Sequence, residues 1–259
     1  MKIVVLVKYV PDATGERGFA VDHTVERSSD GLLSELDEYA VEQALQLADS
    51  GDGVEIVALT VGPSDAAAAL KRALQMGAGA GIHVLDDAIA GSDALATSAV
   101  LAAAIRKVEP DLVLCGMAST DGEMGVVPVM IAERLGWPAA TLGVSLSCGD
   151  GVVTVRRDTD TATLTVEATL PAVVSVTDQS GDPRYPSMRG ILAAKRKKVE
   201  QWDLSDLGIA ADSVGLDAAW SAVHEVVPRP PKEAGTIVAD EDGSGADAFV
   251  EFLAVGKFI

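Results

Sequence analysis

The residues best suited to bind a ligand lie in a loop that follows a short apolar segment, Leu112–Cys115. This segment is typical of a buried strand, and a helix is expected after the loop from about Glu123 to Leu135. At the carboxyl edge of a parallel sheet such a loop binds ligands, and backbone N–H groups at a helix start suit a phosphate. The loop therefore predicts a nucleotide site. Its glycines and polar side chains are Gly116, Gly122, Gly125, Ser119, Thr120 and Asp121.

Other motifs point to no reaction. The run Gly77–Gly81 looks like a dinucleotide fingerprint, but it follows a predicted helix and precedes a strand, the reverse of the order that the fingerprint needs. The chain has no P-loop, nucleophile elbow or zinc-peptidase motif. Asp158 and Asp160 near a hairpin turn favour solvated acids over a catalytic pair, and three scattered histidines with two distant cysteines predict no metal cluster. We expect neither catalytic side chains nor a metal.

A basic segment, Pro183–Lys198, stands out on an acidic chain. It holds six of the chain's basic residues and no acidic one, while the formal net charge is -19. Like charges at this density repel each other unless a partner or an acidic surface compensates them. Met188 follows a proline turn, and a flexible thioether is a common anchor in partner pockets. We expect Pro183–Leu192 to dock a partner and Lys195–Lys198 to end a helix.

Strand and helix patterns alternate through the first half of the chain, and short turns separate them. Helices between strands imply right-handed crossovers and a parallel sheet. The composition, rich in Ala and Val with 4% aromatic residues, suits the same α/β class. The expected strands are Ile3–Val7, Ile56–Val61, Ile82–Leu85, Leu112–Cys115 and Pro171–Val176. The expected helices begin at Ser34, with Ser34 and Asp37 as a capping box, at Ser64, at Ser92 and at Glu123.

The pattern changes after residue 150. Val152–Arg156 and Ala162–Glu167 alternate like the two arms of a β-hairpin. We expect residues 1–200 to form one α/β domain and residues 201–259 to form an extended C-terminal arm. Pro228, Pro230 and Pro231 mark a linker in this arm, the acidic stretch Asp240–Gly245 follows it, and an amphipathic segment, Ala246–Val255, ends it.

Charge and hydropathy exclude several classes of protein. No apolar run reaches the roughly 18–20 residues that a membrane span needs, and the N-terminus lacks the pattern of a secretory signal. The strong acidity argues against nucleic-acid binding, which needs a broad basic face. We therefore expect a cytoplasmic protein that is not itself a membrane protein.

Six fragments, in the same order and spread along nearly the whole chain, resemble the β subunits of electron transfer flavoproteins of the actinobacterial type. Each fragment alone is weak, but their order and spacing together are specific. The fragments are Val7–Asp12, Asp37–Glu42, Ala73–Ala78, Ser119–Gly122, Leu170–Val174, and Pro183–Tyr185 continued by Ala193–Lys198.

The resemblance implies a Rossmann-like fold, with a parallel twisted sheet, helices on both faces, a hairpin and a C-terminal arm that packs on the partner. It implies a heterodimer with an α subunit that holds the redox-active FAD, while this chain holds a structural AMP. Such carriers pass electrons from acyl-CoA and related dehydrogenases to a membrane quinone oxidoreductase in fatty acid β-oxidation. The chain itself is then an electron carrier subunit and not an enzyme.

The resemblance also assigns residues. A recognition loop, residues 183–194, implies docking through Tyr185, Met188, Arg189, Ile191 and Leu192, with Met188 at the anchor position where well-known members have Leu. Asp158 aligns near an acidic residue that restrains the mobile flavin domain. The AMP site implied by the family comprises Leu6, Ser34, Asp37, Val61, Gly116, Ser119, Thr120, Asp121, Gly122, Glu123, Met124, Gly125, Val126 and Val127.

Two departures and three alternatives remain open. Many members have an Asn-Pro pair in place of Ser34-Glu35, and Thr and Gln near Met124 and Val126, so backbone N–H groups carry more of the phosphate binding here. An electron-bifurcating form with a second FAD in this subunit is the first alternative. A stand-alone ATP-binding stress or signalling domain is the second, although its spaced glycines do not follow Leu114. An adenylating enzyme is the third, but its pyrophosphate loop is missing.

Overall fold

A computed structural model gives the fold of the chain, and it describes residues 1–15, 18–27, 31–227, 229–230, 234–240 and 243–259. The described chain divides into two units, Met1–His224 and Glu225–Ile259. No helix among the described residues is long and apolar enough to cross a membrane. Two prolines of the expected linker, Pro228 and Pro231, lie outside the described residues.

The first unit is built on a seven-stranded sheet in which all strand pairs are parallel. The strand order is β12-β5-β4-β1-β6-β11-β7. The strands are β1 (Lys2–Leu6), β4 (Glu55–Val61), β5 (Ala80–Val84), β6 (Leu112–Gly116), β7 (Ala139–Gly143), β11 (Ala172–Val176) and β12 (Val199–Trp202). Successive strands are added on one side of β1 as far as β5, and β6 returns to the other side of β1. The order therefore reverses between β1 and β6, the place where open α/β sheets bind ligands.

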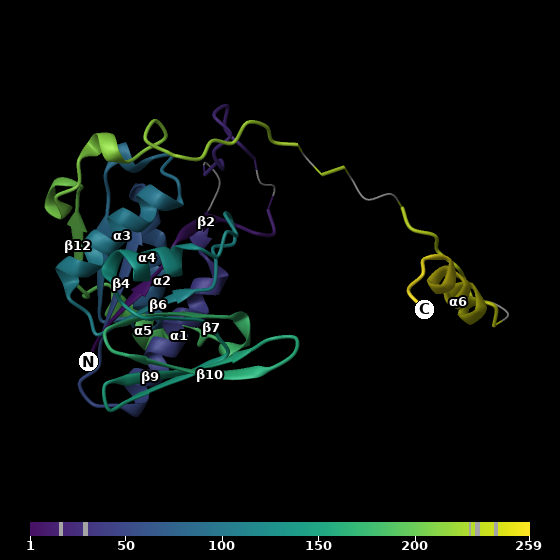
Figure 1. Ribbon diagram of the computed structural model, residues 1–259, viewed down its shortest axis with the longest axis horizontal. Helices are drawn as coiled ribbons and strands as arrows, with labels where there is room; N and C mark the ends of the chain where they lie inside the picture. Colours follow the sequence, from purple (N-terminus) through teal and green to yellow (C-terminus); the bar gives the residue numbers. More distant parts are fainter. Residues whose placement is uncertain (16–17, 28–30, 228, 231–233, 241–242) are drawn as a thin grey trace. The chain divides into compact units, whose positions relative to one another are not determined.

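Helices cover both faces of this sheet, as expected for the class (Figure 1). The longer ones are α1 (Glu35–Ser50), α2 (Ala67–Met76), α3 (Ala94–Val108) and α4 (Val127–Leu135), and α5 (Met188–Ala194) is short. Because side chains alternate along a strand, Ile3 and Val5 enter the core under α1 and α2, whereas Val4 and Leu6 enter the core under α3 and α4. The α/β expectation is confirmed.

A separate antiparallel sheet contains the predicted hairpin. Its strands β8 (Ser145–Gly149), β9 (Val152–Asp158) and β10 (Thr163–Thr169) pair in the order β10-β9-β8, and Val153 and Val155 reach the main core. A small pair, β2 (Tyr9–Pro11) and β3 (Gly31–Leu33), precedes α1. Single turns of 3₁₀ helix occupy Ser64–Ala66, Asp87–Ile89, Asp178–Ser180, Ser205–Leu207 and Ala211–Ser213.

Three local predictions differ from the structure. The helix after the loop starts at Val127 rather than at Glu123, whose positive φ of 52° takes it out of a helix. Ser34 is the N-cap residue of α1, but its side chain makes no capping hydrogen bond. Asp93, not Ser92, caps α3 by accepting the N–H of Ala96 at 3.0 Å.

The first unit continues past residue 200, where the sequence pattern suggested the start of the arm. β12 pairs with β5 at the edge of the sheet, and Leu204 and Val214 are buried in the core beneath α3. These apolar contacts hold residues 201–224 on the domain. The second unit contains one described helix, α6 (Gly245–Val255), none of whose side chains is buried.

Candidate functional site

A cavity of about 320 Å³ lies at the carboxyl ends of β1, β4 and β6, at the point where the strand order reverses. Its walls come from the strand ends, the β6–α4 loop and the first turns of α3 and α4. This size and this mainly apolar lining with a few polar groups are typical of small-ligand sites. The lining residues are Leu6, Val7, Lys8, Asp37, Leu59, Val61, Ser92, Asp93, Ala94, Thr97, Leu101, Cys115, Gly116, Ala118, Ser119, Gly122, Met124, Gly125, Val127, Pro128 and Ser221.

One end of the cavity carries a buried ion-pair network centred on Asp121. Lys8 Nζ donates to Asp121 Oδ1 at 2.8 Å and to Ser119 Oγ at 3.2 Å, and Arg27 pairs with the other carboxylate oxygen. The Asp121 side chain is only 1% exposed, whereas the Lys8 side chain is 43% exposed. Burial alone would raise the pKa of Asp121, but the charge and hydrogen bond of Lys8 outweigh it and hold that pKa well below its usual range.

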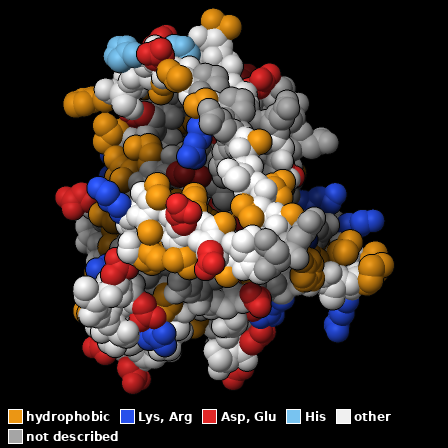
Figure 2. Space-filling view, turned by 90° about the vertical axis from the view of Figure 1, so that its right-hand side faces the viewer, with side chains coloured by type: hydrophobic (Ala, Val, Ile, Leu, Met, Phe, Trp, Pro, Cys, Tyr) orange, Lys and Arg blue, Asp and Glu red, His pale blue; other side chains and the backbone are white. Residues whose placement is uncertain are grey.

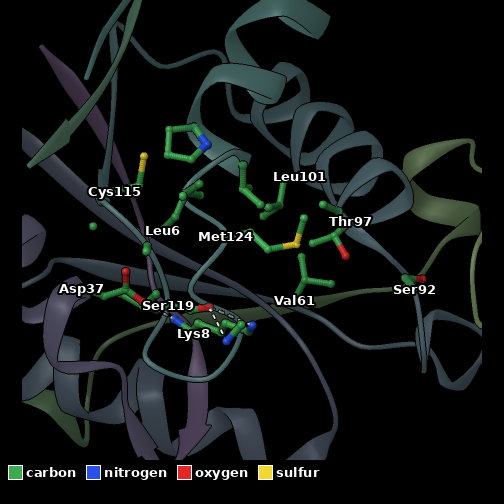
Figure 3. A pocket seen from close by; sticks show the side chains of 18 of the residues that line it. Leu6, Lys8, Asp37, Val61, Ser92, Thr97, Leu101, Cys115, Ser119 and Met124 are labelled. Atoms are coloured by element: carbon green, nitrogen blue, oxygen red, sulfur yellow. Dashed lines mark hydrogen bonds between the residues drawn. The ribbon is translucent and has the colours of Figure 1, made fainter. Parts of the chain in front are cut away.

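Asp37 lies at the same end, on the first turn of α1 (Figure 3). Its carboxylate accepts the backbone N–H of Lys8 at 2.8 Å and that of Gly116. Burial raises the pKa of Asp37 to about 7, although these amides and the Lys8 charge act in the opposite direction. Gly116 makes this approach possible, because a Cβ there would lie 2.7 Å from both Asp37 Oδ1 and the backbone oxygen of Leu36.

The middle of the cavity is apolar and its far end is polar again. Met124 lies among Val61, Thr97 and Leu101, away from Lys8 and Asp37 (Figure 3). At the far end the Asp93 carboxylate, besides capping α3, accepts the N–H of Trp220 at 2.9 Å. The cavity thus has a charged end, an apolar middle and a second polar end, and the charged end suits a phosphate.

The far wall depends on a segment near residue 220 that is distant in sequence. Ser92 Oγ accepts the N–H of Gly215 at 2.8 Å, and Ser221 lines the cavity. Burial would raise the pKa of Asp93, but the N–H groups of Ala96 and Trp220 lower it overall. The segment therefore closes the cavity at the start of α3.

Most residues assigned to the nucleotide site lie on its wall. Ser34, Thr120, Asp121, Glu123 and Val126 do not line the cavity. The lining set is Leu6, Asp37, Val61, Gly116, Ser119, Gly122, Met124, Gly125 and Val127.

Three residues of the assigned set, Ser34, Thr120 and Asp121, do not line the cavity but hold its lining segments in place. The hydroxyl of Ser34 accepts the N–H of Thr120 at 3.4 Å, so it ties the β3–α1 turn to the loop instead of capping α1. Asp121 positions Lys8 through the ion pair described above. They therefore hold the wall of the cavity in place.

Several lining residues were not assigned from the sequence. Lys8 lies in the quoted fragment Val7–Asp12, yet only the fold brings its ammonium beside Ser119. Asp93 carries a local signal, since an Asp before an Ala-rich helix is a typical N-cap. Ser221 has no such signal, because it reaches the cavity through a long-range contact.

The loop amides divide into two groups. The N–H groups of Thr120, Gly122 and Glu123 donate within the chain, to Ser34 Oγ, Asp121 Oδ1 and the Ser119 oxygen. Within the part of the chain that the structure describes, the N–H groups of Met124, Gly125 and Val126 donate to no protein acceptor. The second group is free to bind a ligand.

The recognition segment forms a short exposed helix. Ser187 caps α5 by accepting the N–H of Gly190 at 3.0 Å. Tyr185 and Met188 are 88% and 74% exposed, and Leu192 is also exposed, whereas Ile191 is half-buried. Arg189, between the exposed residues, is exposed as well.

The basic charges of this segment serve different purposes. Arg184 is held by Glu42 at 2.8 Å and by Asp49 at 2.8 Å, so it anchors the segment to α1. Lys197 donates to the Leu74 oxygen at 2.8 Å and Lys198 pairs with Glu200. On the face shown in Figure 2, acidic side chains are widely spread while Lys and Arg side chains gather in fewer places.

Asp158 ends β9 at the hairpin, well away in sequence from the cavity residues. Its carboxylate accepts from Arg156 at 2.8 Å and from Thr163 at 2.8 Å. These hydrogen bonds lower the pKa of this carboxyl. The assigned restraint residue is therefore ionised and partnered within its own hairpin.

Reactive side chains do not gather in the described part of the chain. No group of three or more His, Cys, Asp or Glu side chains there is placed to hold a metal ion. Cys115 lines the cavity, but its thiol is buried and donates to the Val174 oxygen at 3.4 Å. Burial, with Asp37 nearby, raises the pKa of this thiol, so it stays a neutral wall residue.

Comparison with known proteins identifies the family of the chain. The electron transfer flavoprotein domain model matches residues 22–207. The chain is 44% identical to the electron transfer flavoprotein subunit beta of Mycobacterium tuberculosis and 43% identical to that of Mycobacterium leprae, over 99% of both chains in each case. It is 33% identical to the caffeyl-CoA reductase-Etf complex subunit CarD of Acetobacterium woodii, over 92% of each chain. The chain therefore belongs to the electron transfer flavoprotein family, as a β subunit of the actinobacterial type.

Proposed function

We propose that this chain is the non-catalytic β subunit of a cytoplasmic heterodimer that accepts electrons from acyl-CoA and related dehydrogenases. The α subunit carries the redox-active FAD, and the heterodimer passes the electrons to a membrane quinone oxidoreductase in fatty acid β-oxidation. This chain contributes a docking surface and a bound AMP. The observation that carries the proposal is the combination, on one family scaffold, of the nucleotide cavity and the exposed apolar helix α5.

The cavity fits a mononucleotide. Its volume of about 320 Å³ is near the lower limit for ligand sites, which favours AMP over a complete flavin adenine dinucleotide. The apolar middle suits a planar base, and the Lys8 ammonium suits a phosphate. The N–H groups of Met124 and Gly125, two lining residues, supply further donors of the kind that cradle phosphates.

The docking surface is the exposed face around Met188. Tyr185, Met188 and Leu192 present apolar area next to Arg189, a composition typical of interaction hot spots. Arg184 and the capping by Ser187 hold this helix in place on the domain. A dehydrogenase with an apolar pocket rimmed by acidic groups is the partner that this surface suits.

The second unit is proposed to bind the α subunit. Helix α6 exposes Phe249, Phe252 and Val255, and Phe258 follows it, also exposed. An eleven-residue helix is marginal in water unless its apolar side chains are covered. Packing on the α subunit would bury them.

Two alternatives differ in the nucleotide they predict. A bifurcating form would hold a second FAD in this chain, and the relative in a caffeyl-CoA reductase-Etf complex keeps that form open. A stand-alone stress or signalling domain would bind ATP without a flavin-bearing partner.

Extraction of nucleotides from the purified heterodimer distinguishes these cases. We expect one FAD and one AMP per heterodimer, identified by chromatography and absorbance. Two FAD per heterodimer would refute AMP in this chain in favour of the bifurcating form. A stable flavin-free homodimer that binds ATP tightly would refute the carrier function altogether.

A further inference from the structure

Two buried acids lie at the charged end of the cavity, and they are partnered in different ways. Asp121 faces two cations, Lys8 at 2.8 Å and Arg27. The hydrogen bonds of Asp37 come from the backbone N–H groups of Lys8 and Gly116. The Lys8 ammonium itself points to Asp121 and Ser119. Asp37 is therefore a buried carboxyl without a cation of its own.

The charges at this end sum to zero when every group is ionised. Lys8 and Arg27 contribute two positive charges, and Asp121 and Asp37 two negative ones. A phosphate monoester adds about −1.5 to −2 at neutral pH. A buried anion needs compensating charge, and a site with no net charge does not supply it. A neutral Asp37 would leave the site with one net positive charge.

Other groups near Asp37 are unable to make this adjustment. Asp121 is held ionised by its two cations, and the Cys115 thiol is already neutral. On α1 itself, Glu38 pairs with Arg72 at 2.7 Å, and Glu35 is exposed. Burial raises the pKa of Asp37 to about 7, so a small change in its surroundings alters its protonation near physiological pH.

We propose that Asp37 sets the charge of the nucleotide cavity, and that a phosphorylated mononucleotide binds there together with one proton taken up by the Asp37 carboxylate. This inference rests on the proposed nucleotide function and adds the charge state in which the site accepts its ligand. The proton bonds to a carboxylate oxygen of Asp37 and comes from solvent. The neutral carboxyl still accepts one backbone N–H while the repulsion of the phosphate disappears.

Proton uptake makes affinity depend on pH in a defined direction. Above the pKa of the free site the proton must be acquired on binding, so the Kd rises with pH. Complete linkage of one proton gives a tenfold rise in Kd per pH unit. The phosphate of AMP has a second pKa of about 6, so it is already a dianion above pH 7.5 and does not contribute there.

The experiment is a calorimetric titration of the nucleotide-free heterodimer with AMP at pH 7.5 and 8.5. Each pH is measured in two buffers of different ionisation enthalpy, which yields the number of protons taken up. The variants are wild type, Asp37→Asn, and Asp158→Asn as the same change on an exposed carboxylate of the hairpin. Adenosine, which lacks the phosphate, serves as a second ligand.

We expect wild type and Asp158→Asn to take up close to one proton with AMP, and their Kd to rise roughly tenfold between the two pH values. Asp37→Asn should take up none, and its Kd should change less than roughly twofold. Adenosine should bind without proton uptake. Asp37→Ser replaces Asp37→Asn if the latter does not assemble.

Two outcomes would overturn the inference in different ways. AMP binding to wild type without proton uptake, or uptake that persists in the Asp37 variant, removes Asp37 from this role and leaves the AMP proposal standing. Absence of AMP binding to wild type at both pH values removes the nucleotide proposal and this inference with it.

Discussion

Replacing Asp121 by Asn tests whether the ion-pair network holds the charged end of the cavity together. The substitution keeps the shape of the side chain and removes its charge. The side chain of Asp121 is 1% exposed and links Lys8, from the loop after β1, to Arg27, from the segment before β3. Loss of the charge therefore affects three separate parts of the chain.

The expected loss follows from how exposed the partners are. Breaking a fully buried pair costs about 3–5 kcal/mol, because a charge is left without compensation. Here Lys8 and Arg27 are 43% and 31% exposed, so water can rehydrate them. The loss then approaches that of a hydrogen bond to a charged group, and we expect the free energy of unfolding to fall by about 2–3 kcal/mol.

Urea denaturation followed by circular dichroism measures this loss. Asp158→Asn, the same change in an exposed ion pair with Arg156, should leave the urea midpoint nearly unchanged. Because the pKa of Asp121 is lowered from 3.8, its contribution is present above about pH 4 and declines as the pH falls further. The difference between wild type and Asp121→Asn should accordingly be constant from pH 5 to 6, below the pKa of Asp37, which the charge of Asp121 helps to raise.

A double-mutant cycle with Arg27→Gln identifies the source of the loss. If Asp121 and Arg27 act as one network, the double variant should lose less than the sum of the two single variants. Strict additivity, or an Asp121→Asn variant as stable as Asp158→Asn, would refute the network as the element that holds this end together.

Three further predictions concern docking and pH. Met188→Ala should lower kcat/KM for electron acceptance from a dehydrogenase by roughly tenfold or more, since a buried Met contributes about 1.5–3 kcal/mol. The flavin content should be unchanged. An unaltered rate would exclude Met188 as the anchor. Gly190→Ala should slow the same reaction although it adds only one methyl group, because its Cβ would clash with the backbone oxygen of Gln75 and displace α5. A normal rate would show that the position of this helix is unimportant for docking. Because the pKa of Asp37 is raised, wild type should lose stability relative to Asp37→Asn as the pH rises from about 4 to 7, by about 1.4 kcal/mol per pH unit. If the unfolding free energies of the two proteins change in parallel across this range, the pKa of Asp37 is not raised.

The strands that could be predicted were those with a strong local pattern. Leu112–Cys115 is a continuous apolar run, and the structure makes it the buried strand β6. By contrast, β12 (Val199–Trp202) directly follows four basic residues, and two of its four side chains are half-buried and two exposed. An edge strand is stabilised by the hydrogen bonds of its neighbour β5, which no local pattern reveals.

The helix boundaries show the same division. Gly136 ends α4 as predicted, because glycine adopts the left-handed C-cap conformation without steric penalty. Helix α4 begins at Val127 and not at the expected Glu123, because residues 122–125 belong to the loop that runs along the cavity. The start of this helix therefore depends on the cavity beside the loop, which only the tertiary structure defines.

The sequence by itself predicted the α/β fold, from its alternating strand and helix patterns, and it pointed to the loop of glycines and small polar residues that follows β6 and lines part of the cavity. The charge state of the site could not be predicted from the sequence. Lys8, Asp37 and Asp121 come from three segments far apart in the chain, and only folding brings them to one end of one cavity. Burial and distance set their interactions, and both are properties of the assembled core rather than of any stretch of residues.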